Sequence, residues 1–374
     1  MKTANPIKIL ISGASFAGLS TAYWMNKFGY QVTIVEIAPE LKKGGTPVNI
    51  MGTTIDTVKR MGLLDEIVAN KLSMESIAFK NADDVTERLD YHQKNQAERG
   101  EMEYEIERDF LLHLLYDAVK DHTAFIFGDS ITGLKETADH MQVSFKKEAS
   151  QNFDLVFGCD GIHSAVRKHW FGDEAAFSLF LQTYFSISIV DKLLIPENTT
   201  QMYSEPGKTI MLNAYNQKTD ICLAFYSEQE FPYDYRNEEQ MRNIVVDHFR
   251  GTGWRTPELL EEVKQTTGFY FDKLCQMKMP SWSKGRVALV GDAGYCASPA
   301  AGRGGSLAID GAAALADAFE KCNADYEKAF DEYNQSFRPF IEEVQAGVVD
   351  FALDALIPRT EEAIFKRNKE GFGF

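Results

Sequence analysis

The first thirty residues carry the pattern of a βαβ unit, which commits this part of the chain to a parallel sheet. Ile7–Ser12 is a short apolar run that stops at Gly13, as a buried parallel strand does. Gly18–Phe28 then predicts a helix closed by Gly29. Gln31–Glu36 predicts a second strand, so the unit has the expected size of about 30 residues.

The turn between this strand and helix is a variant of a dinucleotide-binding motif. It reads Gly13-Ala-Ser-Phe-Ala-Gly18, with Ser15 at the second glycine of GxGxxG, where the backbone should approach a pyrophosphate. Glu36 ends the second strand 18 residues after Gly18, where a carboxylate accepts hydrogen bonds from a ribose. We therefore predict an adenine dinucleotide at Gly13, Ser15, Ala17, Gly18 and Glu36. The alternative for Glu36 is a solvated acid at a strand end.

A second glycine-rich segment lies near the end of the α/β region. Val287–Val290 predicts a buried strand that leads into Gly291-Asp292. A loop rich in Gly, Ala and Pro follows, then a helix whose first turn, around Gly304-Gly305, is almost free of side chains. Unpaired N–H groups and the helix dipole favour an anion there. Asp292, expected at a strand end, is where open α/β sheets present ligand-binding groups. The alternative is a tight strand–helix unit without a ligand.

Two further segments bear on the choice of cofactor. Phe153–Gly158 predicts a strand that ends in Cys159-Asp160-Gly161, and Glu107–Lys120 predicts a helix that begins beside Arg108. Arg108 could contact a phosphate or the isoalloxazine edge, or form an ordinary ion pair. Three strand ends with small or acidic residues then face one crevice, which favours a long cofactor such as FAD over NAD(P) alone.

In combination these segments resemble a known family. The Gly13-to-Glu36 unit, Cys159-Asp-Gly-Ile-His-Ser-Ala-Val-Arg167 and Gly291-Asp-Ala…Pro299-Ala-Ala-Gly-Arg-Gly-Gly-Ser306 resemble the fingerprints of FAD-dependent aromatic hydroxylases. These are single-component flavoprotein monooxygenases of the para-hydroxybenzoate hydroxylase type. The resemblance spans residues 5 to about 320. The short length and the long C-terminal helix are most similar to the tetracycline-degrading monooxygenase branch.

The resemblance implies a reaction in two halves. NADPH or NADH, bound transiently, reduces FAD. The reduced flavin and O2 then form a C4a-hydroperoxide that hydroxylates an aromatic or polycyclic small molecule. Two alternatives share the fold, namely an FAD-dependent reductase or dehydrogenase and a non-catalytic flavoprotein that sequesters a ligand.

The resemblance also implies roles for residues. Glu36 holds the adenosine ribose, Asp292 binds the ribityl or phosphate part, and the loop at Gly302–Gly305 lies at the flavin pyrimidine ring. Lys42 or Lys43 stands where many members carry an arginine, and Arg303 replaces a residue that is more often uncharged. The expected cofactor residues are Gly13, Ser15, Ala17, Gly18, Glu36, Lys43, Arg108, Asp160, Asp292, Pro299, Gly302, Gly304 and Gly305.

The middle of the chain changes character from about residue 177 to 274. Aromatic and β-branched runs predict an antiparallel sheet interrupted by a helix over Glu238–Arg250. We therefore expect an α/β fold in which a Rossmann-like FAD domain (1–72, 98–176 and 275–322) is interleaved with an α+β substrate domain (73–97 and 177–274). A C-terminal segment (323–374) with a long helix follows. Alternation suggests Tyr184, Met211, Asn213 and Phe225 as substrate contacts, although each could equally be core or exposed sheet. No catalytic base is assigned.

Composition narrows the class of protein. The 374 residues carry a formal net charge of −16, which disfavours nucleic acid and anionic membrane partners. The five cysteines are scattered without a CxxC pair, which suits a reducing cytoplasm and offers no zinc site. We see no metal motif and no transmembrane run, and we leave the oligomeric state open.

Overall fold

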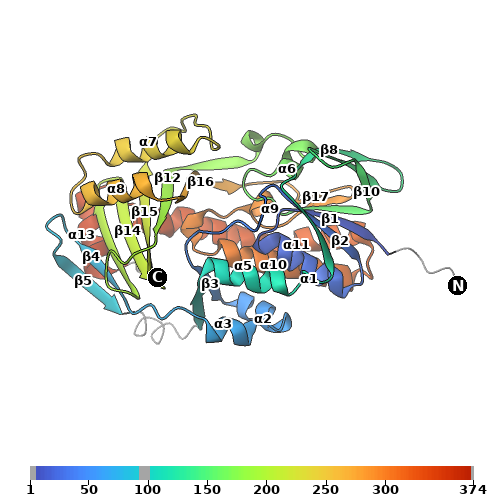
Figure 1. The fold of residues 1–374 in the computed structure, drawn as a ribbon, viewed down its shortest axis with the longest axis horizontal. Coiled ribbons are helices and arrows are strands. Elements are labelled where there is room, and N and C mark those ends of the chain that lie inside the picture. The colour runs from blue at the N-terminus through green and yellow to red at the C-terminus, as the bar shows by residue number, and fades with distance from the viewer. Residues whose placement is uncertain (1–5, 92–101, 372–374) are drawn as a thin grey trace.

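The computed structural model of this chain describes residues 6–91 and 102–371. Two lobes lie side by side, and each is built on a sheet of its own (Figure 1). Within the described ranges, no helix is both long and apolar enough to cross a bilayer.

The first sheet is parallel except for one edge strand and has the order β17-β18-β11-β1-β2-β7. Its register pairs Ile9 with Val32 on one side and with Leu155 on the other. The central strands are almost entirely apolar and buried, as expected where both faces of a sheet are covered. The strands are β1 (Lys8–Ser12), β2 (Gln31–Glu36), β7 (Thr123–Phe127), β11 (Leu155–Gly158), β17 (Ser283–Lys284) and β18 (Val287–Leu289).

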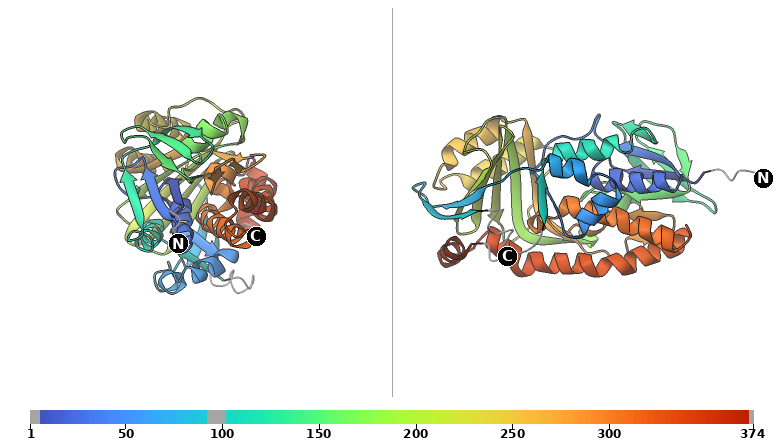
Figure 2. Two further views of the ribbon diagram at one scale, coloured as in Figure 1. Left: turned by 90° about the vertical axis from the view of Figure 1, so that its right-hand side faces the viewer. Right: turned by 90° about the horizontal axis from the view of Figure 1, so that it is seen from below.

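Helices α1 (Phe16–Lys27) and α10 (Gly304–Lys321) pack against each other beside this sheet. Helix α10 is rich in Gly and Ala, and it packs closely on residues outside α1 as well; a methyl group on Gly311 would overlap the hydroxyl of Tyr295. Helix α11 (Tyr326–Gly347) packs on α10. Figure 2 shows α11 running along one side of the molecule, from the parallel-sheet lobe towards the other lobe.

The second lobe contains a sheet of order β16-β12-β15-β14-β13-β4-β5. Helices α7 (Glu238–Phe249) and α8 (Thr256–Gln265) cover one face of it, and Val245 and Phe249 pack there against the sheet. The strands are β4 (Ser76–Lys80), β5 (Thr86–Tyr91), β12 (Ser178–Val190), β13 (Thr199–Glu205), β14 (Lys208–Tyr215), β15 (Lys218–Tyr226) and β16 (Gly268–Met277). The predicted α/β architecture, with a parallel sheet interleaved with an antiparallel one, is confirmed. β16 runs past the domain limit predicted at residue 274, and the limit at 97/98 lies outside the described residues.

The chain between residues 53 and 69 forms two helices, with Gly62 at a positive φ of 74° between them. Two sequence-based expectations need correction. Only part of the strand expected from Phe153 joins the parallel sheet; Phe153 itself belongs to a separate antiparallel sheet of order β10-β9-β8. Asp292 is the first residue of a short helix and not the end of a strand. The elements concerned are α2 (Thr53–Arg60), α3 (Leu64–Ala69), β8 (Ile131–Glu136), β9 (Met141–Phe145), β10 (Gln151–Phe153) and α9 (Asp292–Tyr295).

The C-terminal segment is also more divided than expected. After α11 the chain continues through a π-helical turn and two further helices before it reaches the last described residues. The remaining elements of the described chain are β3 (Val48–Met51), β6 (Glu103–Ile106), α5 (Arg108–Asp117), α6 (Ala165–Trp170), η1 (Glu174–Ala176), η2 (Pro299–Ala301), η3 (Val348–Ala352), α12 (Leu353–Leu356) and α13 (Glu361–Glu370).

Candidate functional site

The turn between β1 and α1 brings two glycines into close contact with the backbone. Gly13 has a φ of 100°, and a Cβ atom there would lie 2.5 Å from the carbonyl oxygen of Cys159. A Cβ atom on Gly18 would overlap the carbonyl of Gly13. Ser15 caps α1 without a side-chain hydrogen bond, and the first helical bond runs from Leu19 N to Ser15 O. The N–H groups of the first turn are therefore free to bind an anion.

Glu36 reaches back from the end of β2 to this turn. Its Oε2 atom accepts a hydrogen bond from Ala14 N at 2.8 Å, and Oε1 accepts one from Ala38 N at 2.8 Å. The side chain is half-buried. Each carboxylate oxygen has capacity for a second donor, so Glu36 can still accept hydrogen bonds from a ribose hydroxyl.

The glycine-rich segment after β18 lies beside the same turn. A Cβ atom on Gly291 would lie 3.0 Å from Cβ of Ala17, and one on Gly305 would lie 2.5 Å from Val48 Cγ1. Gly302 and Gly304 are different, because a Cβ atom on either would meet no atom within 4 Å. Both are exposed. The backbone of this loop therefore borders open space at Gly302 and Gly304.

Asp292 and Pro299 are accessible from that open space. Surrounding protein raises the pKa of the Asp292 carboxyl group, and a hydrogen bond with the Cys296 thiol partly offsets this rise. The Asp292 side chain nevertheless keeps access to solvent, as does Pro299. A group that is both surrounded by protein and reachable by solvent lies in the wall of a hollow, where a ligand hydroxyl can reach it.

Arg108 closes the other side of the α1 N-terminus. Its Nη1 atom donates to the carbonyl oxygens of Gly44 at 2.8 Å and Lys42 at 3.1 Å. Its guanidinium carbon lies 5.3 Å from the centre of the Phe16 ring. Burial lowers the pKa of Arg108, which the nearby Asp109 partly offsets. Lys43 is exposed on the same loop.

Asp160 adjoins the turn between β1 and α1, because a Cβ atom on Gly13 would lie 3.1 Å from the Cα atom of Asp160. Its carboxylate accepts hydrogen bonds from Ala165 N at 2.9 Å and Val166 N at 3.2 Å, and from the hydroxyls of Ser12 and Ser164. These donors fix the start of α6 against β1. Direct contact of Asp160 with a cofactor stays a prediction.

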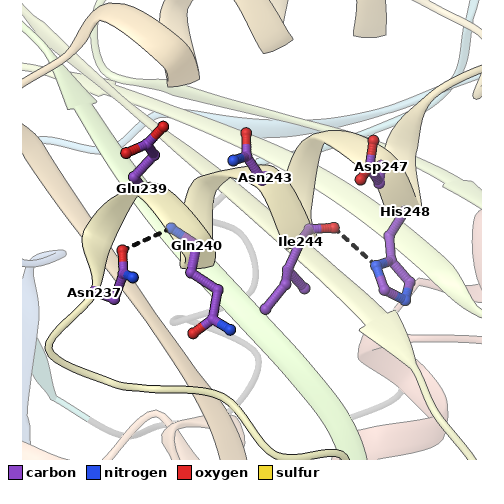
Figure 3. A pocket seen from close by; sticks show the side chains of 7 residues that line it. All are labelled: Asn237, Glu239, Gln240, Asn243, Ile244, Asp247 and His248. Carbon is purple, nitrogen blue, oxygen red and sulfur yellow. Dashed lines mark hydrogen bonds between the residues drawn. The ribbon is translucent and has the colours of Figure 1, made fainter.

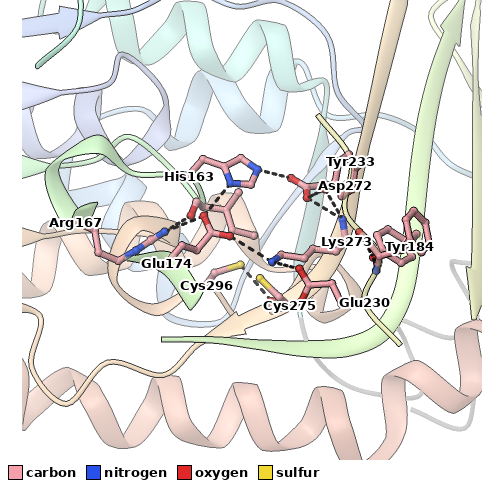
Figure 4. A network of polar contacts seen from close by, with 12 residues as sticks. His163, Arg167, Glu174, Tyr184, Glu230, Tyr233, Asp272, Lys273, Cys275 and Cys296 are labelled. Atoms are coloured by element: carbon pink, nitrogen blue, oxygen red, sulfur yellow. Dashed lines mark hydrogen bonds and ion pairs between the residues drawn. The ribbon is translucent and has the colours of Figure 1, made fainter. Parts of the chain in front are cut away.

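A network of polar contacts joins the loop before α6 to β16 (Figure 4). Nδ1 of His163 lies 2.9 Å from Glu174 Oε2, and Nε2 lies 3.1 Å from Asp272 Oδ2. Asp272 also accepts hydrogen bonds from the hydroxyls of Tyr233 at 2.5 Å and Tyr270 at 3.1 Å. Sequence reasoning missed this network, because its members are up to 109 positions apart.

The sheet of the second lobe has two different faces. Helices α7 and α8 cover one face, and the other face is directed towards the lobe that contains the parallel sheet. On β12, Tyr184 is buried against α7 and α8, whereas the neighbouring Phe185 points to the opposite face. There Phe185, Ala300 and Ala301 pack against one buried cluster of Leu181, Leu274 and Val348. Ile189 approaches Gly44 on the same side. We call this second face the open face. Its partly solvent-accessible side chains include Phe185, Ile187, Ile189, Met211, Cys222 and Tyr270.

The four predicted substrate contacts are therefore not brought together. Tyr184 and Phe225 are 0% and 1% exposed in the core beneath α7, which removes them from contact with a ligand. Met211 lies on the open face, and Asn213 lies on the same side but is buried and accepts a hydrogen bond from Thr200 at 3.0 Å. The better candidates are Phe185 and Tyr270; alternation along β12 and β16 could have found them once the covered face was known.

A separate shallow hollow lies on the outer side of α7 (Figure 3). Its residues come from one helix and the residue before it, and most are polar, so it lacks the apolar lining typical of small-molecule sites. The lining residues are Asn237, Glu239, Gln240, Asn243, Ile244, Asp247 and His248.

Comparison with known proteins identifies the chain. A family described as FAD binding domain matches residues 6–347. A flavin-dependent monooxygenase from an unknown prokaryotic organism is 33% identical over 340 residues, which cover 91% of this chain and 88% of the relative. An uncharacterized protein of Mycobacterium tuberculosis is 35% identical over 346 residues, which cover 91% and 92%.

Among solved structures, tetracycline destructase Tet(51) is 31% identical with a TM-score of 0.86, over 98% of this chain and 95% of that one. These matches agree with the motifs at residues 13–36, 159–167 and 291–306. The chain is an FAD-dependent monooxygenase and belongs to the family of FAD-dependent aromatic hydroxylases, where it stands with the tetracycline-degrading branch.

Proposed function

We propose that this enzyme hydroxylates an aromatic or polycyclic small molecule with O2, using NADPH or NADH as a transient reductant. The observation that carries the proposal is the open face, where Phe185, Ile187 and Tyr270 present a partly accessible apolar surface. Phe185 packs against the same buried cluster as Ala300 and Ala301 of the glycine-rich loop. A flat, partly accessible apolar surface with few polar groups suits an aromatic ligand.

The residues around the hollow fit FAD. The free N–H groups at the start of α1 suit the pyrophosphate, and Glu36 suits the adenosine ribose. Asp292 suits the ribityl or phosphate part, and Gly302 and Gly304 leave room for the ring system. Bound FAD would supply the redox chemistry, accepting electrons from the nicotinamide and then activating O2. These assignments of individual residues are part of the proposal.

The protein contributes position, electrostatics and shelter from water. The N-terminal end of α10 at Gly304 carries unpaired N–H groups and the positive end of the helix dipole, which favour negative charge on a ligand beside it. Tyr270 is held with its hydroxyl on Asp272, so its ring has a fixed orientation on the open face. Phe185, Leu353 and the loop residues Ala300 and Ala301 pack against the buried cluster of Leu181, Leu274 and Val348, which helps to exclude water.

A test of this function uses the purified protein loaded with FAD. Aromatic and polycyclic compounds are screened for stimulation of NADPH and NADH oxidation, and the reactions are repeated under ¹⁸O2. We expect at least one compound to stimulate oxidation and to gain a single labelled oxygen atom, detected by mass spectrometry. Stimulated oxidation with a reduced and unlabelled product would instead establish a reductase. Ligand binding without any oxidation of NADPH or NADH would establish a sequestering flavoprotein.

A further inference from the structure

Two buried glutamines hold the loop that leads into η2. Gln276 of β16 is 0% exposed, and Gln345 of α11 is 2% exposed. Gln345 Nε2 donates to the carbonyl oxygens of Cys296 and Met277, each at 3.1 Å. Gln276 Nε2 donates to the carbonyl of Ala297 at 3.3 Å and to the main-chain carbonyl of Gln345 at 2.7 Å. The two amides thus fix consecutive carbonyls of one loop from two different elements.

The next residue of that loop has a strained backbone. Ser298 adopts a φ of 88° with a ψ of 144°, a conformation that side-chain-bearing residues rarely occupy. Its hydroxyl accepts a hydrogen bond from Ala300 N at 3.3 Å, which starts η2. Such a conformation persists only where the surroundings over-determine it. The carbonyls held by the glutamines, those of Cys296 and Ala297, directly precede it.

Burying these amides carries a cost that an apolar side chain would avoid. Among the described residues, Gln276 Oε1 has no hydrogen-bond partner, and a buried acceptor without a partner destabilises the folded state. A leucine or methionine at that position would not carry this penalty. The amides therefore have a role that depends on their N–H groups, and those groups reach the loop.

The loop connects to both sides of the cofactor hollow. Cys296 lowers the pKa of the Asp292 carboxyl group, and Ala300 and Ala301 pack against the buried cluster of Leu181, Leu274 and Val348, as Phe185 of the open face does. A change in the backbone conformation of Ser298 would therefore move the loop that carries Gly302 and Gly304.

We propose that Gln345 is a positioning residue for the cofactor, assisted by Gln276. It holds Ser298 in its strained conformation and so fixes the backbone at Pro299–Gly304 in the geometry that binds FAD. The inference rests on the proposed placement of FAD at this loop. It gives α11, which lies outside the dinucleotide-binding motifs, a direct part in shaping the site.

The test replaces Gln345 by methionine, which has similar length and stays buried but donates no hydrogen bond. We expect Gln345→Met to raise the dissociation constant of FAD about tenfold or more, the effect of releasing one strained residue. We also expect the visible absorption band of the bound flavin to shift. The control is Lys278→Met, which removes the 2.7 Å hydrogen bond from Lys278 Nζ to Gln345 Oε1 but leaves both N–H donations intact. It should bind FAD as the wild type does.

A second substitution separates positioning from general support of the fold. Glycine adopts a positive φ without strain, so Ser298→Gly in the Gln345→Met background should restore FAD affinity to near the wild-type value. If Gln345→Met alone fails to fold, the double variant should fold and bind FAD. The proposal is overturned if folded Gln345→Met binds FAD with unchanged affinity and spectrum. It is equally overturned if the double variant shows no recovery.

These measurements use FAD alone, so a failure of the proposed oxygenation does not affect them. The placement of FAD at the loop is checked separately with Gly304→Ala. If that variant binds FAD normally, the placement is wrong, whereas a defect in Gly304→Ala without one in Gln345→Met refutes the positioning role alone.

Discussion

The Nε2 atom of His163 lies 3.1 Å from Oδ2 of Asp272, and this contact joins the loop before α6 to the central part of β16. The other ring nitrogen faces Glu174 Oε2 at 2.9 Å, so the imidazole is held between two carboxylates from different elements. Burial lowers the pKa of His163, but the hydrogen bonds and charges of Asp272 and Glu174 outweigh burial and raise it to about 9. The two lobes are thus connected by a protonated histidine at neutral pH.

This contact predicts a pH-dependent contribution to stability. A histidine whose pKa is about 9 when folded and about 6.5 when unfolded stabilises the fold fully below the lower value. That contribution is lost as the pH rises through the higher value. We expect His163→Gln to lower the free energy of unfolding by roughly 2–4 kcal/mol at about pH 6 and by much less near pH 10.

Denaturant unfolding of both proteins across this pH range measures the difference. The control is His113→Gln, which replaces an exposed histidine of α5 and should change little at any pH. If His163→Gln lowers the free energy of unfolding by the same amount from pH 6 to 10, the protonated ring has no such role.

Gly304→Ala should separate folding from cofactor binding. A methyl group there meets no atom within 4 Å, so the apoprotein should keep its stability, or gain up to about 1 kcal/mol from the better helix former. The same methyl occupies the space where the cofactor is proposed to lie, and FAD affinity should fall about tenfold or more. Gly347→Ala is a matched control, because Gly347 is also helical with open space around it. Thermal unfolding of the apoprotein and flavin titration distinguish the two variants.

Asp292→Ala should reduce the FAD content of the purified protein. Loss of one hydrogen bond to a charged group corresponds to roughly a 10- to 100-fold rise in the dissociation constant. The control Asp331→Ala removes an exposed carboxylate of α11 and changes the net charge equally. Unchanged flavin content in Asp292→Ala would remove this residue from the proposed site.

The parts of the fold that follow from local pattern could be predicted from the sequence. β2 has its predicted limits, and β1 begins one residue after its predicted start. A short apolar run that ends at a glycine or a charged residue marks both limits of a buried strand. The three motifs follow β1, β11 and β18, which are neighbouring parallel strands and therefore end at the same edge of the sheet. By contrast, α8 and the β8–β10 sheet were missed although the sequence carries a signal for both. Leu259, Leu260 and Val263 have the spacing of one helix face in α8, and Met141, Val143 and Phe145 alternate along β9.

Long-range relationships limited the prediction of the site. The carboxylate of Asp160 follows a strand, as the motif requires, but whether it faces a ligand or a helix start depends on Ser164 and the docking of α6. The contact between His163 and Asp272 likewise depends on how two lobes meet. Alternation on β12 separates Tyr184 from Phe185 but does not say which of the two faces the helices cover.

The assignment of faces leads to a final prediction with a matched pair of residues. Phe225 and Met211 come from neighbouring strands but from opposite faces of the sheet. Phe225→Ala opens a cavity in the core beneath α7 and should lower the free energy of unfolding by about 3–5 kcal/mol. Met211→Ala, on the open face, should cost less stability, since its side chain is already partly accessible. It should instead raise the KM for the substrate that stimulates NAD(P)H oxidation, with FAD affinity unchanged. Denaturant unfolding and steady-state kinetics measure both effects, and a KM effect in Phe225→Ala with none in Met211→Ala would reverse the assignment of the two faces.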